Sequence, residues 1–306
     1  MTGRDKSVAM QQPDPIVPVG SPRRAFVVGD ATETNTRLVS TFAAHGYPSA
    51  MTAPGHPIPA VPGDLVLVRL DVLPTLDGVE SGLEVVHEVE RTGATLLNRP
   101  AALLGAHDKL ETALLLASGD VPHPPTVHVQ EPRVPETLRP PYVIKPRFGS
   151  WGRDVFRCET PAELLACLEL LAPRPWFRKQ GAIVQELVSP TGHDLRVVVA
   201  AGSVVGAVER IAPPGEWRTN VALGAQRRPV EPDPEACLAA VRAAAAIGID
   251  LAGIDLIAGR DGYVILEVNG AVDFTAEYGL SGSDPFVAAV TALGDAFAEP
   301  ALATAT

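Results

Sequence analysis

Short apolar runs alternate with amphipathic segments in the first hundred residues of the chain. The apolar runs predict buried strands, and the segments between them predict helices. The expected strands are residues 25–30, 64–70 and 94–98, and the expected helices are residues 33–44 and 82–91. Strands that alternate with helices build a parallel sheet, so we expect an N-terminal α/β unit over residues 24–99. No GxGxxG motif follows the first strand, which disfavours a nicotinamide-dependent oxidoreductase.

Beyond residue 99 the pattern predicts helices together with mainly β structure, in two α+β units over residues 100–188 and 189–299. The expected helices are residues 108–117, 162–171, 235–247 and 285–297. The expected strands are residues 126–129, 142–146, 182–188, 194–200, 203–211, 252–257 and 262–268, the last two as a hairpin. Residues 1–23 are polar and contain several prolines, which predicts a disordered leader, and residues 300–306 are expected to form a frayed tail.

The most informative polar residues lie in the predicted hairpin. Asp255 is on its first strand, and Glu267 and Asn269 are two residues apart on the second, so their side chains share one face. Two carboxylates and an amide oxygen are hard ligands that suit Mg²⁺ bound to phosphate. The alternative is a polar strand edge that faces solvent. The apolar neighbours favour the metal site, because carboxylates in core-like strands need a charged partner.

A lysine lies inside an apolar strand, just before a glycine-containing loop. Lys145 follows Val143 and Ile144, and the loop reads Gly149-Ser150-Trp151-Gly152. A buried lysine needs an anion, and backbone N–H groups beside glycine can approach a phosphate closely. The order differs from a Walker A loop, in which the lysine follows the glycines. The alternatives are a lysine that extends to solvent beside an ordinary turn and, for Lys109, a lysine on a helix surface.

Two further groups of residues are weaker candidates. Arginines near the ends of predicted strands could converge on a phosphate or carboxylate, which a guanidinium binds through two hydrogen bonds. They are Arg196, Arg210 and Arg218, the last close to Asn220. The alternative, equally supported for each alone, is a set of surface arginines paired with Asp194, Glu209 and Glu216. Gln185 and Glu186 end an apolar strand at a domain change, where backbone groups could contact an adenine ring.

Composition narrows the classes of partner. The 306 residues include 25 Lys and Arg against 36 Asp and Glu, a net charge of −11, which argues against nucleic acid or an anionic membrane as partner. Three cysteines without CxxC spacing argue against a zinc site or a disulfide framework. No apolar run reaches the ~18 residues of a membrane span, and none near the N-terminus suits a signal peptide. We therefore expect a soluble cytoplasmic protein.

Taken in order, these motifs resemble the ATP-grasp superfamily, and within it the RimK/LysX-type carboxylate–amine ligases. The resemblance extends over residues 25–298. Its most specific parts are Lys145-Pro146, Gly149-Ser150-Trp151-Gly152-Arg153, Gln185-Glu186, Asp194-Leu195-Arg196, Arg218-Thr219-Asn220, Asp255-Leu256 and Glu267-Val268-Asn269. The glycine loop is most similar to that of the lysine-biosynthesis enzymes that extend an amino-group carrier protein. The resemblance implies an ATP-grasp fold of α/β and α+β class, in which a Rossmann-like domain precedes two α+β domains that clasp ATP.

The resemblance also implies a role for each motif residue. The residues expected to bind ATP are Lys109, Lys145, Gly149, Ser150, Trp151, Gly152, Gln185, Glu186, Val188, Asp194 and Arg196. Those expected to hold Mg²⁺ are Asp255, Glu267 and Asn269, with two ions bound and Mn²⁺ able to replace them. Those expected to face the transferred phosphoryl group and the acyl centre are Arg210, Arg218 and Asn220.

The implied reaction is ATP-dependent amide formation through an acyl phosphate, with release of ADP and phosphate. We expect amino-acid-like substrates. One alternative is a ligase that extends the C-terminal carboxylate of a carrier protein or peptide, and another is a non-catalytic ATP-binding scaffold. The complete motif set favours catalysis. The resemblance further implies a homo-oligomer, either a dimer or a tetramer.

Two segments depart from the pattern of this family. Residues 221–228 lack the Gly-Gly of many relatives, and Val272-Asp273-Phe274 replaces the Met-Glu-Phe of the lysine-type enzymes. Both segments fall where a substrate would bind, so neither glutamate nor aminoadipate follows from the resemblance alone. Arg227 and Arg228 are candidates for binding a second carboxylate, or for a basic patch that docks an acidic carrier protein.

Overall fold

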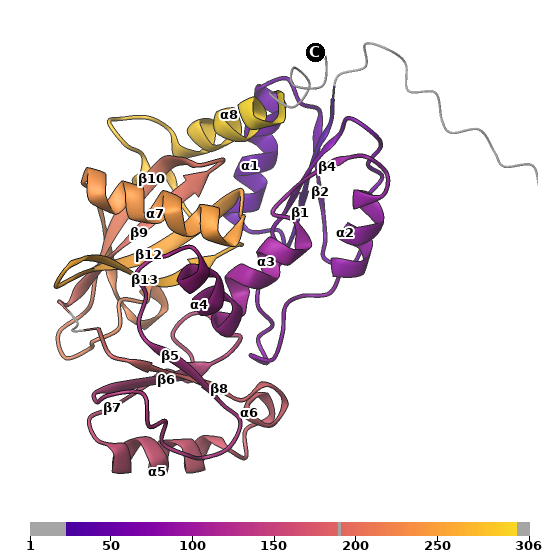
Figure 1. Ribbon diagram of the computed structural model, residues 1–306. Helices are drawn as coiled ribbons and strands as arrows, with labels where there is room; N and C mark the ends of the chain where they lie inside the picture. The colour runs from indigo at the N-terminus through magenta and orange to yellow at the C-terminus, as the bar shows by residue number, and fades with distance from the viewer. Residues whose placement is uncertain (1–22, 189–190, 299–306) are drawn as a thin grey trace, which may run out of the picture.

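A computed structural model describes residues 23–188 and 191–298, so the expected leader, apart from Arg23, and the expected tail lie outside the described residues. Figure 1 shows the central unit at the bottom of the molecule and the N- and C-terminal units side by side above it. No helix of the described residues is long and apolar enough to cross a membrane.

The N-terminal unit is a four-stranded parallel sheet, as predicted, with the strand order β2-β1-β3-β4. Its elements are β1 (Ala25–Val28), α1 (Glu33–Ala44), β2 (Ser49–Thr52), β3 (Leu65–Val68), α2 (Leu83–Glu90) and β4 (Thr95–Leu97). Helix α1 has the predicted bounds. Thr32 caps it by accepting a hydrogen bond from the backbone N–H of Asn35, and Leu38 and Phe42 point into the core.

The central unit is a four-stranded antiparallel sheet covered on one face by two helices. Its elements are β5 (Thr126–Val129), β6 (Tyr142–Pro146), β7 (Phe156–Cys158), α5 (Pro161–Leu171), α6 (Pro175–Gln180) and β8 (Ala182–Glu186). Because neighbouring residues of a strand point to opposite faces, Ile144 joins the core under α5 and α6 while Val143 and Lys145 face a cavity. The sheet therefore presents Lys145 to the rest of the molecule.

The C-terminal unit is a five-stranded antiparallel sheet with the order β11-β10-β9-β12-β13. Its elements are β9 (His193–Ala200), β10 (Ser203–Ile211), η1 (Val221–Leu223), β11 (Gln226–Pro229), α7 (Pro234–Ile247), β12 (Leu251–Gly259), β13 (Gly262–Asn269), η2 (Ala276–Tyr278) and α8 (Pro285–Ala298). The predicted hairpin is present, with Asp255 directly opposite Glu267.

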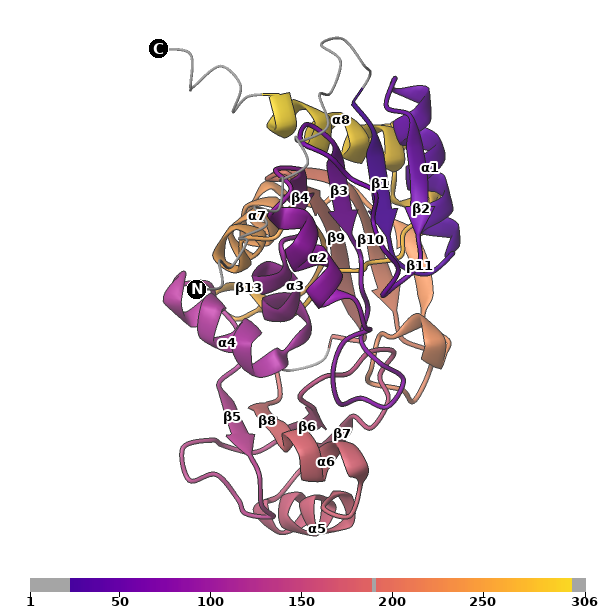
Figure 2. The ribbon, with the colours of Figure 1, turned by 90° about the vertical axis from the view of Figure 1, so that its right-hand side faces the viewer.

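The N- and C-terminal units share one hydrophobic core. Val198 and Ala200 of β9 pack with α1, α8 and the parallel sheet, and Figure 2 shows α8 above the strands of that sheet. Helices α3 (Pro100–His107) and α4 (Lys109–Ser118) pack against α7 and β13. The division at residues 24–99, 100–188 and 189–299 remains a proposal. Each of the three sheets lies within one of these ranges. Helices α3 and α4, however, belong to the second range and pack on the C-terminal unit.

Four α-helices and strands, and the two short helices η1 and η2, are missing from the sequence-based assignment. The four are β2, α3, α6 and β11. Strand β11 reads Gln-Arg-Arg-Pro and is exposed, so it forms through pairing with β10 and carries no apolar pattern. Helix α3 begins with proline and includes a glycine, and it is covered on most sides by the surrounding structure, so it shows no amphipathic period.

Candidate active site

Two cavities lie between the units and meet each other. The first, of about 990 Å³ including open solvent, lies between the open face of the central sheet, the glycine loop and the C-terminal sheet. The second, of about 1030 Å³ including open solvent, lies between the C-terminal sheet, residues 271–273 that follow β13, and Asp71 of the N-terminal unit. Four residues line both cavities, and they are Ser150, Arg210, Asn220 and Glu267. The cavities therefore join at this group.

One face of the C-terminal sheet carries a row of charged side chains across neighbouring strands. Arg196 on β9 is opposite Asp255 on β12, which is opposite Glu267 on β13. Arg210 on β10 is opposite both Asp194 on β9 and Arg227 on β11. Residues paired across strands point to the same side of the sheet. The same face of β9 is apolar where the N-terminal unit covers it, so the charges gather where the cavities open.

Asp255 is held by two arginines. Its carboxylate accepts hydrogen bonds from Nε and Nη2 of Arg196, both at 2.7 Å, and forms an ion pair of 2.9 Å with Nη2 of Arg210. Arg210 also donates to both oxygens of Asp194, which accepts a further bond from the hydroxyl of Thr219. Burial alone would raise the pKa of Asp255, but the two guanidinium groups hold the pKa below its ordinary value. The carboxylate is therefore ionised.

Glu267 faces two lysines. Nζ of Lys109 lies 2.9 Å from Oε1 of Glu267 and also donates to the backbone carbonyl of Gly149. Although burial would raise the pKa of Glu267, Lys109 and Lys145 lower it. Burial and the charge of Lys109 lower the pKa of Lys145 to about 8. Two ammonium groups whose charges interact in this way favour the binding of a polyanion beside them.

The proposed metal ligands form a suitable donor set. Asp255, Glu267 and Asn269 lie on one face of the hairpin, and the side-chain Nδ2 of Asn269 is buried without a hydrogen-bond partner among the described residues. A buried amide without a partner is costly, and turning the amide would offer its oxygen on the face of the hairpin that carries the two carboxylates, beside the cavity that Glu267 also lines. Three hard oxygen donors therefore fit Mg²⁺.

The glycine loop closes over the junction of the cavities. Gly152 has φ +70°, and a Cβ atom there would lie 2.7 Å from Oδ1 of Asn220, so only glycine fits. Trp151 also has positive φ, at 66°, and its side chain is 52% exposed. Nη1 of Arg218 donates to the carbonyls of Gly152 and Val155. The predicted phosphoryl-facing arginine therefore holds the loop.

The structure brings most of the predicted site residues together around the first cavity. They are Lys109, Lys145, Gly149, Ser150, Gly152, Gln185, Glu186, Val188, Asp194, Arg210, Arg218, Asn220, Asp255 and Glu267. Three predicted residues line the second cavity and not the first, and they are Trp151, Arg196 and Asn269. Within the first cavity, Asp194 is bound by Arg210 and Thr219, and Glu186 accepts a hydrogen bond from the backbone of Arg139.

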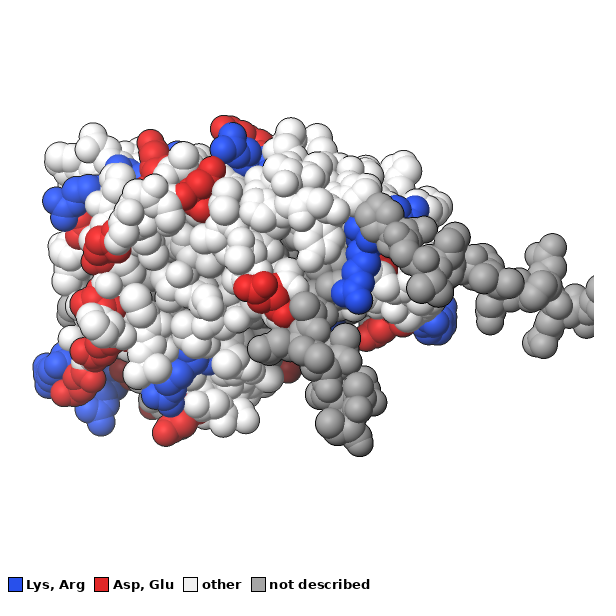
Figure 3. Space-filling model, turned by 90° about the horizontal axis from the view of Figure 1, so that it is seen from above, with Lys and Arg blue, Asp and Glu red and all other residues white. Residues whose placement is uncertain are grey.

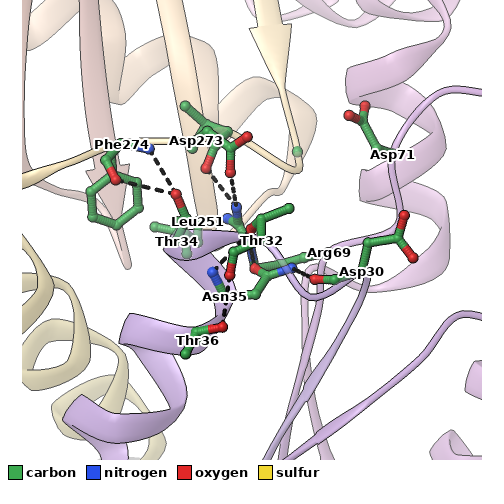
Figure 4. A network of polar contacts seen from close by, with 12 residues as sticks. Asp30, Thr32, Thr34, Asn35, Thr36, Arg69, Asp71, Leu251, Asp273 and Phe274 are labelled. Atoms are coloured by element: carbon green, nitrogen blue, oxygen red, sulfur yellow. Dashed lines mark hydrogen bonds and ion pairs between the residues drawn. The ribbon is translucent and has the colours of Figure 1, made fainter.

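Sequence reasoning missed the contribution of the N-terminal unit. Arg69 is fully buried at the end of its strand, where it donates to Oδ1 of Asn35 and to the carbonyl of Val272, and its Nη2 lies 4.0 Å from Oδ1 of Asp273 (Figure 4). This contact joins the parallel sheet to the segment after β13. The available signal was position, because ligands bind at the carboxyl ends of parallel strands and Asp71 follows β3 there.

Three separate sheets with a charged cleft and a glycine loop between them suit a protein that binds a nucleoside triphosphate. The chain belongs to the RimK-like ATP-grasp family, whose model matches residues 106–284, and it is an ATP-dependent carbon–nitrogen ligase. It is 32% identical over 254 residues to a protein of Xanthomonas campestris pv. campestris (strain 8004) named "Probable alpha-L-glutamate ligase", covering 81% of this chain and 83% of that protein. A Stutzerimonas stutzeri (strain A1501) protein of the same name is 31% identical over 209 residues, covering 66% of this chain and 68% of that protein.

Solved structures share the fold, as the resemblance predicted. The ATP-grasp ligase PsnB complexed with a minimal precursor, Mg and ADP has a TM-score of 0.64 at 20% identity, covering 89% of this chain and 98% of its own. D-alanine–D-alanine ligase from Bacillus anthracis has a TM-score of 0.63 at 16% identity, covering 93% of this chain and 98% of its own. These likenesses confirm the ATP-grasp fold of mixed α/β and α+β elements, and ATP and Mg²⁺ are the cofactors of this family.

Proposed function

We propose that ATP binds in the first cavity and that the carboxylate to be activated enters from the second. The observation that supports this is the meeting of the two cavities at Ser150, Arg210, Asn220 and Glu267. The γ-phosphate of ATP and a substrate carboxylate must come within bonding distance, and a junction of two cavities provides that geometry. The charged groups around the junction then act on the phosphoryl group in transfer.

In this proposal each charged group has a role in phosphoryl transfer. Lys109 and Lys145 bind the phosphates. Two Mg²⁺ ions would be held by Asp255, Glu267 and Asn269, and Mn²⁺ could replace them. The metal would neutralise charge that develops on the phosphoryl oxygens. Arg210, Arg218 and Asn220 face the transferred phosphoryl group and the acyl centre, and Arg218 also holds the glycine loop through the carbonyls of Gly152 and Val155. Closure by that loop excludes water, which would otherwise hydrolyse an acyl phosphate.

The reaction then proceeds in two displacements. A carboxylate oxygen bonds to the γ-phosphorus while the bond to the bridging oxygen breaks, which gives an acyl phosphate and ADP. The amine nitrogen next bonds to the acyl carbon, phosphate leaves with the electron pair of the broken C–O bond, and the nitrogen loses its protons to phosphate and solvent. No covalent enzyme intermediate is required, which agrees with a site composed of phosphate-binding and metal-binding groups.

We propose amino-acid-like substrates. The support is the charge of both signs in the second cavity, where Arg227 of β11 could bind a substrate carboxylate and Asp71 lies among the lining residues. The relatives named as glutamate ligases agree with a substrate of this class. The alternative is extension of the C-terminal carboxylate of a carrier protein or peptide, which the size of the second cavity would also admit.

The test is a reaction of purified protein with ATP, Mg²⁺ and the twenty standard amino acids. We expect ADP, phosphate and a new amide mass, and Glu267→Gln should lose this activity. Glu169→Gln, an exposed change on α5, is the matched control and should keep it. Release of AMP would contradict the acyl-phosphate route. Turnover only with a C-terminal peptide acid would favour the carrier-protein alternative.

We further propose that the protein is a cytoplasmic homo-oligomer, a dimer or tetramer. Figure 3 shows charges of both signs scattered around a broad uncharged area on the face seen from above. Helix α8, which lies at the top in Figure 1, carries one charged residue in its sequence, Asp295. A face with few charges suits contact between copies. Light scattering of the eluting protein would show the mass, and a monomer at micromolar concentration would contradict the proposal.

A further inference from the structure

Asp71 is a carboxylate in the second cavity that lacks the arginine or lysine partner that the proposed metal ligands have. It follows β3 in the N-terminal unit and lines the cavity together with Glu267, Asn269 and Arg227. Its side chain accepts a hydrogen bond from the backbone N–H of Val72, at 2.6 Å. Among the described residues no lysine, arginine or histidine nitrogen lies within ion-pair distance of it. Its charge is therefore available to a ligand.

The surroundings of Asp71 select a positively charged ligand. Burial, then the charges of Asp273 and Glu267, raise the pKa of Asp71, while the backbone hydrogen bond from Val72 and the nearby Arg69 oppose this rise. Nε and Nη2 of Arg69 are bound to other partners, its buried Nη1 has no partner among the described residues, and Figure 4 shows Asp71 to one side of the Arg69–Asp273 contact with no dashed line to either residue. Glu267 is paired with Lys109 and Asp273 with Arg69, so Asp71 is the carboxylate of this group whose charge a ligand cation would neutralise.

The loop that carries Asp71 is held at several points. The backbone of Asp71 exchanges hydrogen bonds with Glu80, whose N–H donates to the carbonyl of Asp71 and whose side chain accepts from its N–H. At the tip of the loop, Leu76 enters the core of the central unit and Asp77 forms an ion pair with Lys179. A carboxylate on a loop held at both ends is positioned before any ligand arrives.

The place of Asp71 matches the place where an amine must react. Its charge interacts with that of Glu267, one of the four residues at the junction of the cavities. An ammonium group bound at Asp71 would therefore lie next to the acyl phosphate that forms at that junction. The proposed function requires an amine at this point. The other two acidic residues that line the second cavity, among the described residues, already have ion-pair partners. Glu267 pairs with Lys109, and Asp273, which is half exposed, pairs with Arg69.

We propose that Asp71 binds the ammonium group of the amine substrate beside the acyl phosphate. The bound ammonium group loses one proton to water before its nitrogen lone pair bonds to the acyl carbon and phosphate leaves, and the nitrogen then loses a second proton to give the amide. The N-terminal unit thereby contributes a substrate-binding residue to a site whose other charged groups come from the central and C-terminal units. This inference rests on the proposed ligase reaction. If it is correct, the Asp71 side chain determines whether the enzyme prefers a charged amine to an uncharged nucleophile.

The test compares two nucleophiles in the wild-type protein and in Asp71→Asn. With ATP, Mg²⁺ and the amino-acid mixture, the variant should form amide with a KM for the amine raised at least tenfold and with an unchanged KM for ATP. With hydroxylamine, which is uncharged at neutral pH and traps acyl phosphates as hydroxamates, the variant should match the wild type. Asp71→Glu should restore part of the amide formation. Glu88→Gln, an exposed change on α2 of the same unit, is the control and should behave as the wild type in both assays.

The outcomes separate this inference from the proposed function. Absence of hydroxamate with the wild-type protein would contradict the acyl phosphate itself. Hydroxamate formation that falls with Asp71→Asn would place Asp71 at the activated carboxylate substrate and overturn the inference. A raised KM for ATP would place Asp71 on the nucleotide side and overturn it as well. Equal amide formation by Asp71→Asn and wild type would show that the carboxylate binds no amine.

Discussion

The two cavities differ in how their charged groups are paired. Around the first cavity the carboxylates and cations are already joined in ion pairs, as Asp255 is with Arg210, and Glu267 with Lys109. The second cavity also has paired groups, such as Arg196 and Asp273, but among the described residues its Asp71 has only a backbone donor and its Arg227 has a long contact of 3.7 Å to Glu277. The first set is held in place before a ligand binds, whereas the second set still has charge to offer.

This difference follows from what each cavity must bind. A triphosphate with its metal has the same charge in every turnover, so a fixed arrangement of charges can be complementary to it. A substrate is chosen by its charge pattern, and a group that already has a partner discriminates weakly. We therefore expect substitutions at the first cavity to affect stability and turnover together, and those at the second cavity to affect the KM of a substrate. The four predictions below test this contrast.

The largest effect is expected for Asp255→Asn. This change leaves Arg196 without its carboxylate partner in a buried site, and breaking a buried pair costs about 3–5 kcal/mol. Turnover should also be lost, because Asp255 is a proposed metal ligand. Chemical denaturation measures the first effect and ADP release the second. Asp284→Asn removes the exposed pair with Arg37 and should cost less than about 1 kcal/mol. If the Asp255→Asn protein is as stable as the wild type, the ion pairs around the first cavity do not stabilise the fold before a ligand binds.

Glu267→Gln should lower kcat about 10²–10³-fold, because it removes one group that stabilises the transferred phosphoryl charge. It should also lower stability, but less than Asp255→Asn does, because its partner Lys109, whose side chain is 10% exposed, keeps its hydrogen bond to the carbonyl of Gly149. Steady-state release of phosphate measures the effect. If kcat is unchanged, Glu267 is not a metal ligand, and the row of charges on the sheet is structural.

The pH dependence of nucleotide affinity should come from Lys145, whose pKa burial and Lys109 lower to about 8. Above pH 8 the empty site loses the proton of Lys145, so the Kd for ATP should rise about tenfold per pH unit. The folded pKa lies below the unfolded value of 10.5, so the unfolded chain holds the proton longer and the empty protein gains stability from pH 8 to 10.5.

Titration calorimetry with ADP and Mg²⁺ between pH 7 and 9.5 measures this dependence. Lys145→Arg should flatten the profile, because a guanidinium stays charged throughout the range. An equally steep profile in that variant would assign the titration to another group. The substrates of the second cavity should show no corresponding change, since Lys145 does not line it.

The sequence predicts the parts of the site that local periodicity determines. Glu267 and Asn269 share a face because they are two residues apart in a strand, and a hairpin brings Asp255 opposite Glu267. The apolar run around Lys145 likewise predicts a buried strand with a costly charge. These inferences need only one element and its neighbour in the chain, and the structure brings the residues together as expected.

The second cavity depends on contacts between distant parts of the chain. Asp71 and Asp273 belong to different units, with the whole central unit between them in the chain, and they become neighbours because the N-terminal sheet packs on the C-terminal one. The loop of Leu76 has no periodic pattern that predicts its insertion into the central unit. Strand β11, which presents Arg227, is polar throughout. Positions determined by tertiary packing leave no local signal to read.

The smallest effect is expected for Trp151→Ala, and it separates the two cavities most directly. The sequence assigns Trp151 to ATP, whereas the structure places it at the second cavity, with its side chain 52% exposed. A substrate that covers the indole would lose about 1 kcal/mol of contact, so its KM should rise about fivefold while the KM for ATP stays constant. Leu170→Ala, an exposed change on α5, is the control. If the KM for ATP rises by the same factor, Trp151 also contacts ATP, and the closed glycine loop contacts both ligands.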